Sequence, residues 1–427
     1  MIETFLQGLM YPFLFISMYF QILLLVTFFE NKKRIKKEEV FHIQHFPSVT
    51  ICVPCWNEEE TVGGTIESLL ALDYPKNKLQ IIVVDNNSND RTLEVANTYK
   101  KRFPLQVEVM TEHVQGKHNA VNKALSSSTS ELFGCLDADS FVDKNALRVS
   151  VSYFGDPSIM AVTPCMHIYK PKTFIQRMQA IEYLLGIFLR KAFGQLDAIQ
   201  VTPGPFSIFR RTVFEKLGAY RKAHNTEDYE ITLRMHKAHL KIANAHKSLV
   251  YTTGPSTIRG YFYQRLRWVR GFLENSLDYK EIFFKKKYGN FGMFTLPTAF
   301  AFVFYGTYTI FFAMYIYITR LFDVVERWMT IGIHPRTPTF DIFFWNTTVV
   351  AFVGMVMITI LLLSLYVANT LSDDKQEFYR NFPIYIILYP LFIPFILSRA
   401  ILDTFTRRKN DWVLQDNKAK LQTFSTR

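Results

Sequence analysis

Two carboxylates one residue apart, Asp137 and Asp139, are the residues of this sequence whose spacing points most directly to chemistry. They follow residues 131–136, an apolar run typical of a buried strand. Carboxylates this close repel each other unless a positive charge lies between them. A hard divalent cation, which also binds phosphate oxygens, meets that need. Surface turns also produce this pattern, but the strand that precedes it favours a metal-binding site.

Two further predicted strand ends carry polar residues of the right type. Asp85 begins a polar cluster, residues 85–90, directly after a second apolar strand. The cluster fits a turn with a helix N-cap, and it equally fits a carboxylate that binds a base or a ribose. Lys117 follows a glycine at the start of a predicted helix, where the helix N-terminus and the ammonium group both favour a phosphate. Three such strand ends in succession favour one shared site.

The elements that must position these residues alternate between strand and helix over residues 48 to about 165. Such alternation predicts a doubly wound, mostly parallel α/β sheet. In an open sheet of this kind ligands bind at the carboxyl ends of the strands. The predicted strands are 49–53, 81–84, 107–110 and the run into Asp137, and the predicted helices are 58–72, 91–102 and 116–125.

A membrane anchor is expected at the amino terminus. Residues 5–29 are nearly all apolar and long enough to span a bilayer, and they lack the basic start and the cleavage site of a signal peptide. Five basic residues follow within residues 32–37, so the positive-inside rule places the following domain in the cytoplasm. The net charge of +12 then fits anionic lipid better than nucleic acid, and no nucleic-acid partner is expected.

The carboxyl-terminal part is expected to be a membrane domain, with helices at about 293–319, 343–369 and 381–402. Pro390 and Pro394 interrupt the last segment, which is therefore either a full crossing or a broken, re-entrant segment. Four crossings would put the tail outside, whereas its basic charge favours the inside. The topology stays open at this point.

Two segments are expected to lie in the membrane interface. Residues 173–196 are apolar on one side but contain Arg177 and Glu182, so an interfacial helix fits better than a full span. A core helix of the soluble domain is the alternative. The expected domains are an N-terminal transmembrane helix at 1–30, a cytoplasmic catalytic domain at 31–275, an interfacial segment at 276–292, transmembrane helices within 293–402 and a basic tail at 403–427.

The successive motifs resemble those of processive, membrane-embedded family 2 glycosyltransferases. The poly-β-1,6-N-acetylglucosamine synthases are the most similar group, with hyaluronan, chitooligosaccharide and cellulose synthases as relatives. The motifs that carry the resemblance are Pro54–Glu59, Val83–Ser88, Gly116–Asn122, Asp137–Asp139, Thr226–Asp228 and the Q-x-x-R-W pattern of Gln264–Trp268.

The resemblance implies a GT-A-like nucleotide-sugar fold that binds a UDP-sugar, with UDP-N-acetylglucosamine favoured. Asp85 would hold the uracil, while Asp137 and Asp139 would bind ribose, diphosphate and a Mg²⁺ or Mn²⁺ ion. The implied donor-binding residues are Asn57, Glu58, Asp85, Lys117, Asp137, Asp139, Gln264, Arg265 and Arg267.

The last motif also has a physical interpretation. On a helix, Gln264, Arg267 and Trp268 share one face. The guanidinium of Arg267 can bind diphosphate oxygens through two parallel hydrogen bonds, and Trp268 offers a flat surface on which a sugar can stack. Trp268 is therefore expected on the acceptor side, together with Gly204 and Pro205 of a glycine- and proline-rich loop.

Glu227 and Asp228 open a predicted helix, where acids are common for electrostatic reasons alone. The resemblance instead implies that they are catalytic and that Asp228 is the general base for the acceptor hydroxyl. The expected function is transfer of sugar to a growing polysaccharide that crosses the bilayer, with an accessory membrane or export subunit as partner. Two alternatives stay open: a ceramide glucosyltransferase-like enzyme with a lipid acceptor, and a catalytically dead scaffold or transporter.

Overall fold

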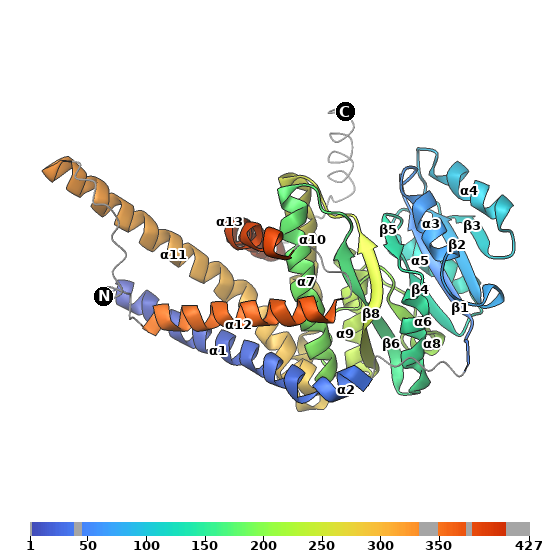
Figure 1. The fold of residues 1–427 in the computed structure, drawn as a ribbon, viewed down its shortest axis with the longest axis horizontal. Helices are drawn as coiled ribbons and strands as arrows, with labels where there is room; N and C mark the ends of the chain where they lie inside the picture. Colours follow the sequence, from blue (N-terminus) through green and yellow to red (C-terminus); the bar gives the residue numbers. More distant parts are fainter. Residues whose placement is uncertain (1, 38–44, 333–348, 373–377, 407–427) are drawn as a thin grey trace.

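The computed structural model describes residues 2–37, 45–332, 349–372 and 378–406. An α/β domain forms one side of the molecule, and long apolar helices extend from it on the other (Figure 1). Two helices, α7 (Phe174–Gln195) and α10 (Ile258–Asp278), stand between the sheet and the apolar helices.

In the described part of the chain, eight strands form one sheet in the order β3-β2-β1-β4-β7-β6-β8-β5. Strands β3, β2, β1 and β4 are parallel, as are β6 and β8, whereas β7 and β5 run antiparallel to their neighbours. The mostly parallel α/β sheet is therefore confirmed. The strands are β1 Val49–Cys55, β2 Leu79–Asp85, β3 Val107–Thr111, β4 Leu132–Cys135, β5 Ser140–Val142, β6 Ile159–Ile168, β7 Ile208–Arg210 and β8 Lys241–Thr252.

Alternate residues of β1 enter two different cores, because successive side chains of a strand point to opposite faces. Val49, Ile51 and Val53 pack with α3, α4 and α6, whereas Cys52 packs with α5 and with the helices next to the membrane domain. Both faces of the sheet are thus covered, which explains the near-continuous apolar strands. The short helices are α2 Lys32–Lys37, α3 Val62–Leu70, α4 Thr92–Arg102, α5 Lys117–Ser127, α6 Ala146–Ser152, α8 Arg211–Leu217 and α9 Glu227–Lys237.

Four helices in the described part of the chain are long and apolar enough to cross a membrane. They are α1 Ile2–Glu30, α11 Leu296–Ile331, α12 Val349–Leu371 and α13 Phe378–Phe405. Helix α11 continues past the span expected at 293–319 and ends at Ile331, and the bounds of the membrane-spanning part stay a prediction. The start of the span expected at 343 and most of the basic tail lie outside the described residues.

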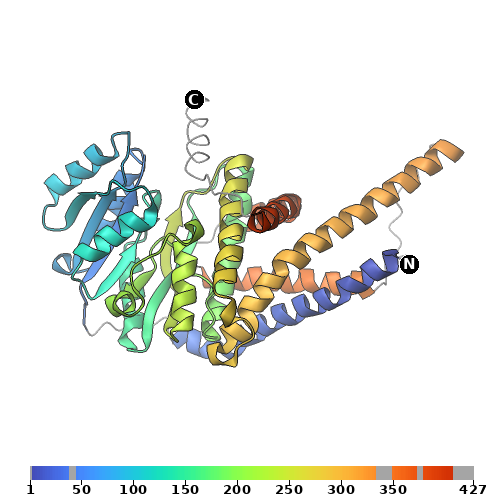
Figure 2. The same ribbon diagram turned by 180° about the vertical axis from the view of Figure 1, so that it is seen from behind.

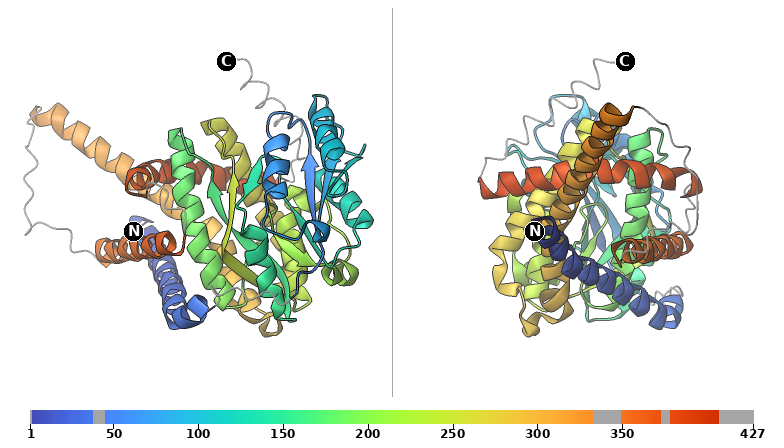
Figure 3. Two further views of the ribbon diagram at one scale, coloured as in Figure 1. Left: turned by 45° about the vertical axis from the view of Figure 1, so that its right-hand side comes forward. Right: turned by 90° about the vertical axis from the view of Figure 1, so that its left-hand side faces the viewer.

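Helix α13 is continuous through Pro383, Pro390 and Pro394, so the segment is not broken. It lies across the direction of α1 and α12: Figure 1 shows those two lengthwise and α13 end-on, and the right-hand view of Figure 3 shows α13 lengthwise. Seen from behind, α11 extends farthest from the α/β domain (Figure 2).

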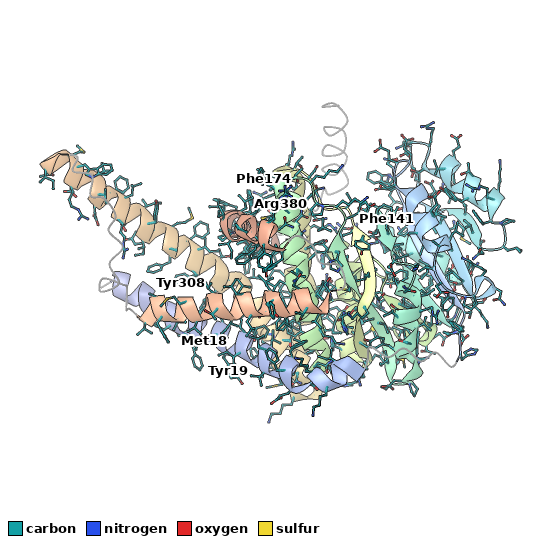
Figure 4. All side chains as sticks on the ribbon, viewed as in Figure 1. Met18, Tyr19, Phe141, Phe174, Tyr308 and Arg380 are labelled. Atoms are coloured by element: carbon teal, nitrogen blue, oxygen red, sulfur yellow. The ribbon has the colours of Figure 1, made fainter. Side chains whose placement is uncertain are left out.

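The exposed surface of these helices is largely apolar, but the last turns of α11 carry the exposed charged residues Arg320, Asp323, Glu326 and Arg327. Tyr19 of α1, labelled in Figure 4, is 52% exposed, and its ring meets that of Phe294 edge-on with the ring centroids 6.2 Å apart. Helix α7 contacts α1, α12 and α13 on one side and β6 and β8 on the other. The interfacial location expected for residues 173–196 stays a prediction, and the structure gives this helix a packed position between the two parts of the protein.

Candidate active site

The carboxyl ends of β1 and β2 lie side by side, with Cys55 paired to Asp85. Asp85 is only 3% exposed. One of its carboxylate oxygens accepts the N–H of Ser88 at 3.4 Å, and the other, Oδ1, has no hydrogen-bond partner among the described residues. A buried, ionisable oxygen without a partner costs free energy, so this atom is suited to accept a hydrogen bond from a ligand.

Asn57 and Glu58 connect the loop after β1 to the loop after β2. Oδ1 of Asn57 accepts the N–H of Asn89 at 2.8 Å, and the N–H of Glu58 donates to the hydroxyl of Thr92 at 2.8 Å. Both residues predicted from the sequence therefore lie beside Asp85. Their hydrogen bonds to Asn89 and Thr92 shape the loop around it.

Asn86, a residue to which the sequence assigned no role, positions the segment before α5. Its Nδ2 donates to the carbonyls of Glu112 and Val114 at 3.0 and 2.8 Å, and its Oδ1 accepts the N–H of Gly116 at 2.7 Å. These bonds fix the start of the helix that presents Lys117.

Lys117 joins the end of β4 to the start of α9. Its Nζ lies 2.5 Å from Oδ1 of Asp137 and 3.5 Å from Oε1 of Glu227. Burial lowers the pKa of Lys117, but the two carboxylates outweigh burial and hold the pKa well above its usual value. The ammonium group is therefore charged, and it neutralises acids that the sequence had assigned to separate motifs.

The loop between α7 and β7 approaches this cluster closely. The N–H of Gly204 donates to Oδ2 of Asp228 at 3.3 Å. A Cβ atom on Gly204 would lie 2.8 Å from Nζ of Lys117, so only glycine fits without a shift of the lysine. Pro205 follows and is buried, and the N–H of Phe206 donates to the carbonyl of Cys135 at 2.5 Å, which ties the loop to β4.

Asp228 lies in the first turn of α9. Besides Gly204, it accepts the N–H of Tyr229 at 2.8 Å through Oδ1. Burial and the neighbouring Glu227 raise the pKa of Asp228 to about 6, while Lys117 and Arg267 oppose this shift. A carboxylate with a pKa near neutrality is suited to accept a proton from a hydroxyl group.

Helix α10 carries the Q-x-x-R-W residues. Arg267 contacts the segment before α9, whereas Gln264 and Trp268 contact Arg265. Nη1 of Arg267 donates to the main-chain carbonyl of Asn225 at 3.0 Å, just ahead of α9. Trp268 is 36% exposed and stacks with the guanidinium of Arg265 at 4.1 Å. Gln264 accepts a hydrogen bond from Arg265.

Arg265 was expected to bind the donor, and the structure gives it another partner. Its side chain is buried, and it donates from Nε and Nη2 to the two carboxylate oxygens of Glu182 on α7 at 2.9 and 2.7 Å. This bidentate pair joins the two helices that lie between the sheet and the apolar helices. Arg265 therefore connects the two helices, and its part in donor binding stays a prediction.

Asp139 and Asp137 fit the ligand preferences of a hard divalent cation. Oδ1 of Asp139 accepts the hydroxyl of Ser140 at 3.1 Å, and its main-chain carbonyl accepts Thr253 at 3.3 Å. Among the described residues no group of three or more His, Cys, Asp or Glu side chains could hold a metal ion. Two carboxylates suit an ion that takes its remaining ligands from a substrate's phosphates and water.

The same end of the parallel strands thus carries a buried carboxylate oxygen at Asp85 and a cluster in which Lys117 contacts Asp137 and Glu227. Asp228 lies beside this cluster. The model of a protein family described as "Glycosyltransferase like family 2" matches residues 47–271, which is more than half of the chain. The chain belongs to glycosyltransferase family 2. The residues of this family 2 site all lie within the matched region.

Curated relatives of this family 2 chain include poly-beta-1,6-N-acetyl-D-glucosamine synthases. That of Staphylococcus epidermidis is 29% identical over 268 residues, and that of Staphylococcus aureus is 27% identical over the same length. Each match covers 62% of this chain and 64% of the relative.

A solved structure shares the fold. A mannosyltransferase from Pyrobaculum calidifontis, in complex with GDP-Man and Mn²⁺, is 18% identical, with a TM-score of 0.61. The match covers 96% of this family 2 chain and all of the mannosyltransferase. The likeness therefore extends beyond the α/β domain and supports the GT-A-like architecture with apolar helices.

Proposed function

We propose that this protein is an inverting hexosyltransferase that moves N-acetylglucosamine from UDP-N-acetylglucosamine to a growing polysaccharide. The observation that carries the proposal is the single cluster in which Lys117 contacts Asp137 and Glu227, next to Asp228. The similarity to poly-beta-1,6-N-acetyl-D-glucosamine synthases supports the choice of donor and polymer.

The donor binds along the carboxyl ends of the parallel strands. The unpartnered Oδ1 of Asp85 accepts an N–H from the uracil ring. Lys117 and Arg267, which both act electrostatically on Asp228, bind the diphosphate beside it. Asn57 and Glu58 hold the loop around the base, as their contacts to the loop after β2 indicate.

Asp228 acts as the general base. It takes the proton from the acceptor hydroxyl while the hydroxyl oxygen attacks the anomeric carbon, and the bond from that carbon to the diphosphate breaks. The departing nucleotide keeps the electron pair, and the configuration at the anomeric carbon inverts. One base is enough for this single displacement, and Lys117 and Arg267 stabilise the negative charge that develops on the leaving group.

Asp137 and Asp139 would hold a Mg²⁺ or Mn²⁺ ion. Such an ion stabilises the charge on the leaving diphosphate. Glu227 keeps Lys117 between the two carboxylate groups, and the exposed ring of Trp268 offers a surface on which an acceptor sugar can stack.

The membrane part serves export of the product. The basic residues that follow α1 favour a cytoplasmic catalytic domain, and α7 and α10 lie between the site and the apolar helices. A polymer made at this position can pass directly into the membrane domain. An accessory membrane subunit would bind there.

The test uses the full chain in nanodiscs with Mg²⁺ or Mn²⁺ and radiolabelled UDP-N-acetylglucosamine, with products separated by size. A ladder or a high polymer supports the proposal. A single labelled lipid would replace it with transfer to a lipid acceptor. Absence of nucleotide release from any UDP-sugar, in a folded preparation, would refute it. Asp228→Asn is the matched inactive variant.

A further inference from the structure

The segment just before the proposed base has an unusual backbone. Ala223, His224 and Asn225 have φ angles of 45°, 52° and 62°. Residues with side chains rarely adopt this left-handed conformation, and three in a row are rarer still. Such strain persists where the surrounding contacts over-determine it. Since α9 begins at Glu227, the conformation of this segment sets where the helix starts.

Helix α10 holds the two ends of the segment by hydrogen bonds to its backbone. Nδ2 of Asn275 donates to the carbonyl of Ala223 at 3.0 Å. Nη1 of Arg267 donates to the carbonyl of Asn225 at 3.0 Å. Both carbonyls therefore face α10.

The middle residue is held through its side chain. Nδ1 of His224 lies 3.1 Å from Oε2 of Glu274, and its Nε2 lies 2.8 Å from Oδ2 of Asp278. An imidazole with both nitrogens against carboxylates is favoured in its charged form. These bonds raise the pKa of His224 to about 9, although partial burial acts the other way.

A fourth contact is steric. A Cβ atom on Gly271 would lie 2.3 Å from Oγ1 of Thr226, so glycine is required for the segment to lie directly on α10. Oγ1 of Thr226 also accepts a hydrogen bond from Nδ2 of Asn275 at 2.9 Å. The main-chain carbonyl of Thr226 in turn accepts the N–H groups of Tyr229 and Glu230, which opens α9.

The α10 residues that make these contacts share one helical face, because they are spaced by three, four or one along the chain. They are Arg267, Gly271, Glu274, Asn275 and Asp278. We propose that residues 223–225 form a left-handed turn, that α10 holds this turn and the following Thr226 in place, and that the turn sets the position of Asp228, with His224 as a positioning residue. The catalytic part of this inference rests on the proposed function.

The charged groups around His224 determine the pH range in which its side chain holds the turn. Glu274 and Asp278 face it from α10, and Arg270 pairs with the other oxygen of Glu274 at 2.7 Å. On α9, Glu227 faces Lys117 instead. Because the pKa of His224 is raised from 6.5 to about 9, its bonds are fully formed below pH 6.5 and are lost as the pH rises through 9.

The first experiment measures whether α10 holds the turn, and it needs no substrate. Asp278→Asn weakens one imidazole contact at a side chain that is 60% exposed, so folding is preserved. Glu281→Gln is the control, because that acid is also exposed and pairs with Lys237 away from the turn. Hydrogen exchange of the peptide covering residues 221–233 should be faster in Asp278→Asn and unchanged in Glu281→Gln.

The second experiment measures the effect on Asp228. In Asp278→Asn, kcat at pH 8 should fall about tenfold, since small misplacements of a catalytic group have effects of this order or larger. The KM for the nucleotide sugar should change less than about twofold, because donor contacts are intact. The alkaline limb of the kcat profile should move to lower pH, which a general loss of stability would not produce.

The two experiments separate the possible failures. Exchange and kcat equal to those of Glu281→Gln would overturn the proposal of a held turn. Faster exchange with unchanged kcat would show that α10 holds the turn without positioning the base, which overturns the catalytic part. A wild-type chain that releases no nucleotide from any sugar donor would refute the proposed function, while the exchange comparison would still decide whether α10 holds the turn.

Discussion

Nζ of Lys117 lies 2.5 Å from Oδ1 of Asp137. These two residues come from different motifs, one at the start of α5 and one at the end of β4. Their contact places a fixed positive charge beside the carboxylates proposed to bind metal and diphosphate. The cationic part of the site is therefore built into the protein before any ligand binds, which is the arrangement expected for electrostatic catalysis.

Replacing Lys117 by methionine should lower kcat/KM about 100-fold, because the leaving diphosphate loses one charge-assisted contact and Asp137 and Glu227 are left facing each other. Nucleotide release is the measurement. Lys123→Met is the matched control on the same helix, since Lys123 pairs with Glu112 away from the site. A similar loss in both variants would count against a specific role for Lys117.

Gly204→Ala tests the close approach of the acceptor-side loop. The new Cβ would lie 2.8 Å from Nζ of Lys117 and would push the lysine from Asp137. We expect kcat/KM about tenfold lower with the melting temperature almost unchanged, because a flexible side chain can move. Gly155→Ala, which meets no atom within 4 Å, should leave both quantities at wild-type values.

The acid limb of the activity profile should reflect Asp228. With a pKa of about 6, this base is protonated at lower pH, so kcat should fall about tenfold per unit below pH 6 and level off above it. Asp228→Asn should reduce kcat roughly 100-fold or more and abolish this limb.

Stability separates chemistry from folding in that variant. Because burial raises the pKa of Asp228, its ionised form opposes folding above that pKa. Asp228→Asn should therefore melt at the wild-type temperature or higher at pH 7.5. A lower melting temperature would mean that the lost activity reflects unfolding.

The Glu182–Arg265 pair predicts a stability effect far from the base. Glu182→Gln leaves the buried guanidinium without its counter-charge and should cost about 2–4 kcal/mol, measured as a lower melting temperature in detergent. Asp73→Asn breaks the exposed pair with Arg148 and should cost less than about 0.5 kcal/mol. Replacing Glu182 and Arg265 together by leucine should cost less than the single change, and an equal loss would contradict this account.

The amino-terminal half of the sheet could be predicted from the sequence because its strands are apolar on both faces. The predicted and observed ends of β1, β2 and β3 differ by at most two residues. The strands that complete the sheet could not be predicted in this way, since β7 has only three residues and β8 is partly polar. Their positions depend on pairing between distant segments.

For the residues of the site, too, the residue type could be predicted to matter, but the contacts between distant segments could not. The types of Asp85, Lys117 and Asp228 indicated chemistry, and the structure brings Lys117 next to acids from two other motifs. The contact between Arg265 and Glu182 could not be predicted, because both faces of α10 carry arginine. The left-handed turn at His224 could not be predicted either, since Ala223 is not a residue type that favours this backbone and single His or Asn residues are only weak indicators of it.

The direction of α13 bears on which side of the bilayer the tail occupies. A helix that lies across α1 and α12 can rest along the membrane surface although it is long enough to span. With α1, α11 and α12 as the crossings, the chain passes through the bilayer an odd number of times and ends on the side of the catalytic domain. The excess of basic residues in the sequence after α13 favours the same side by the positive-inside rule, so charge and helix direction agree.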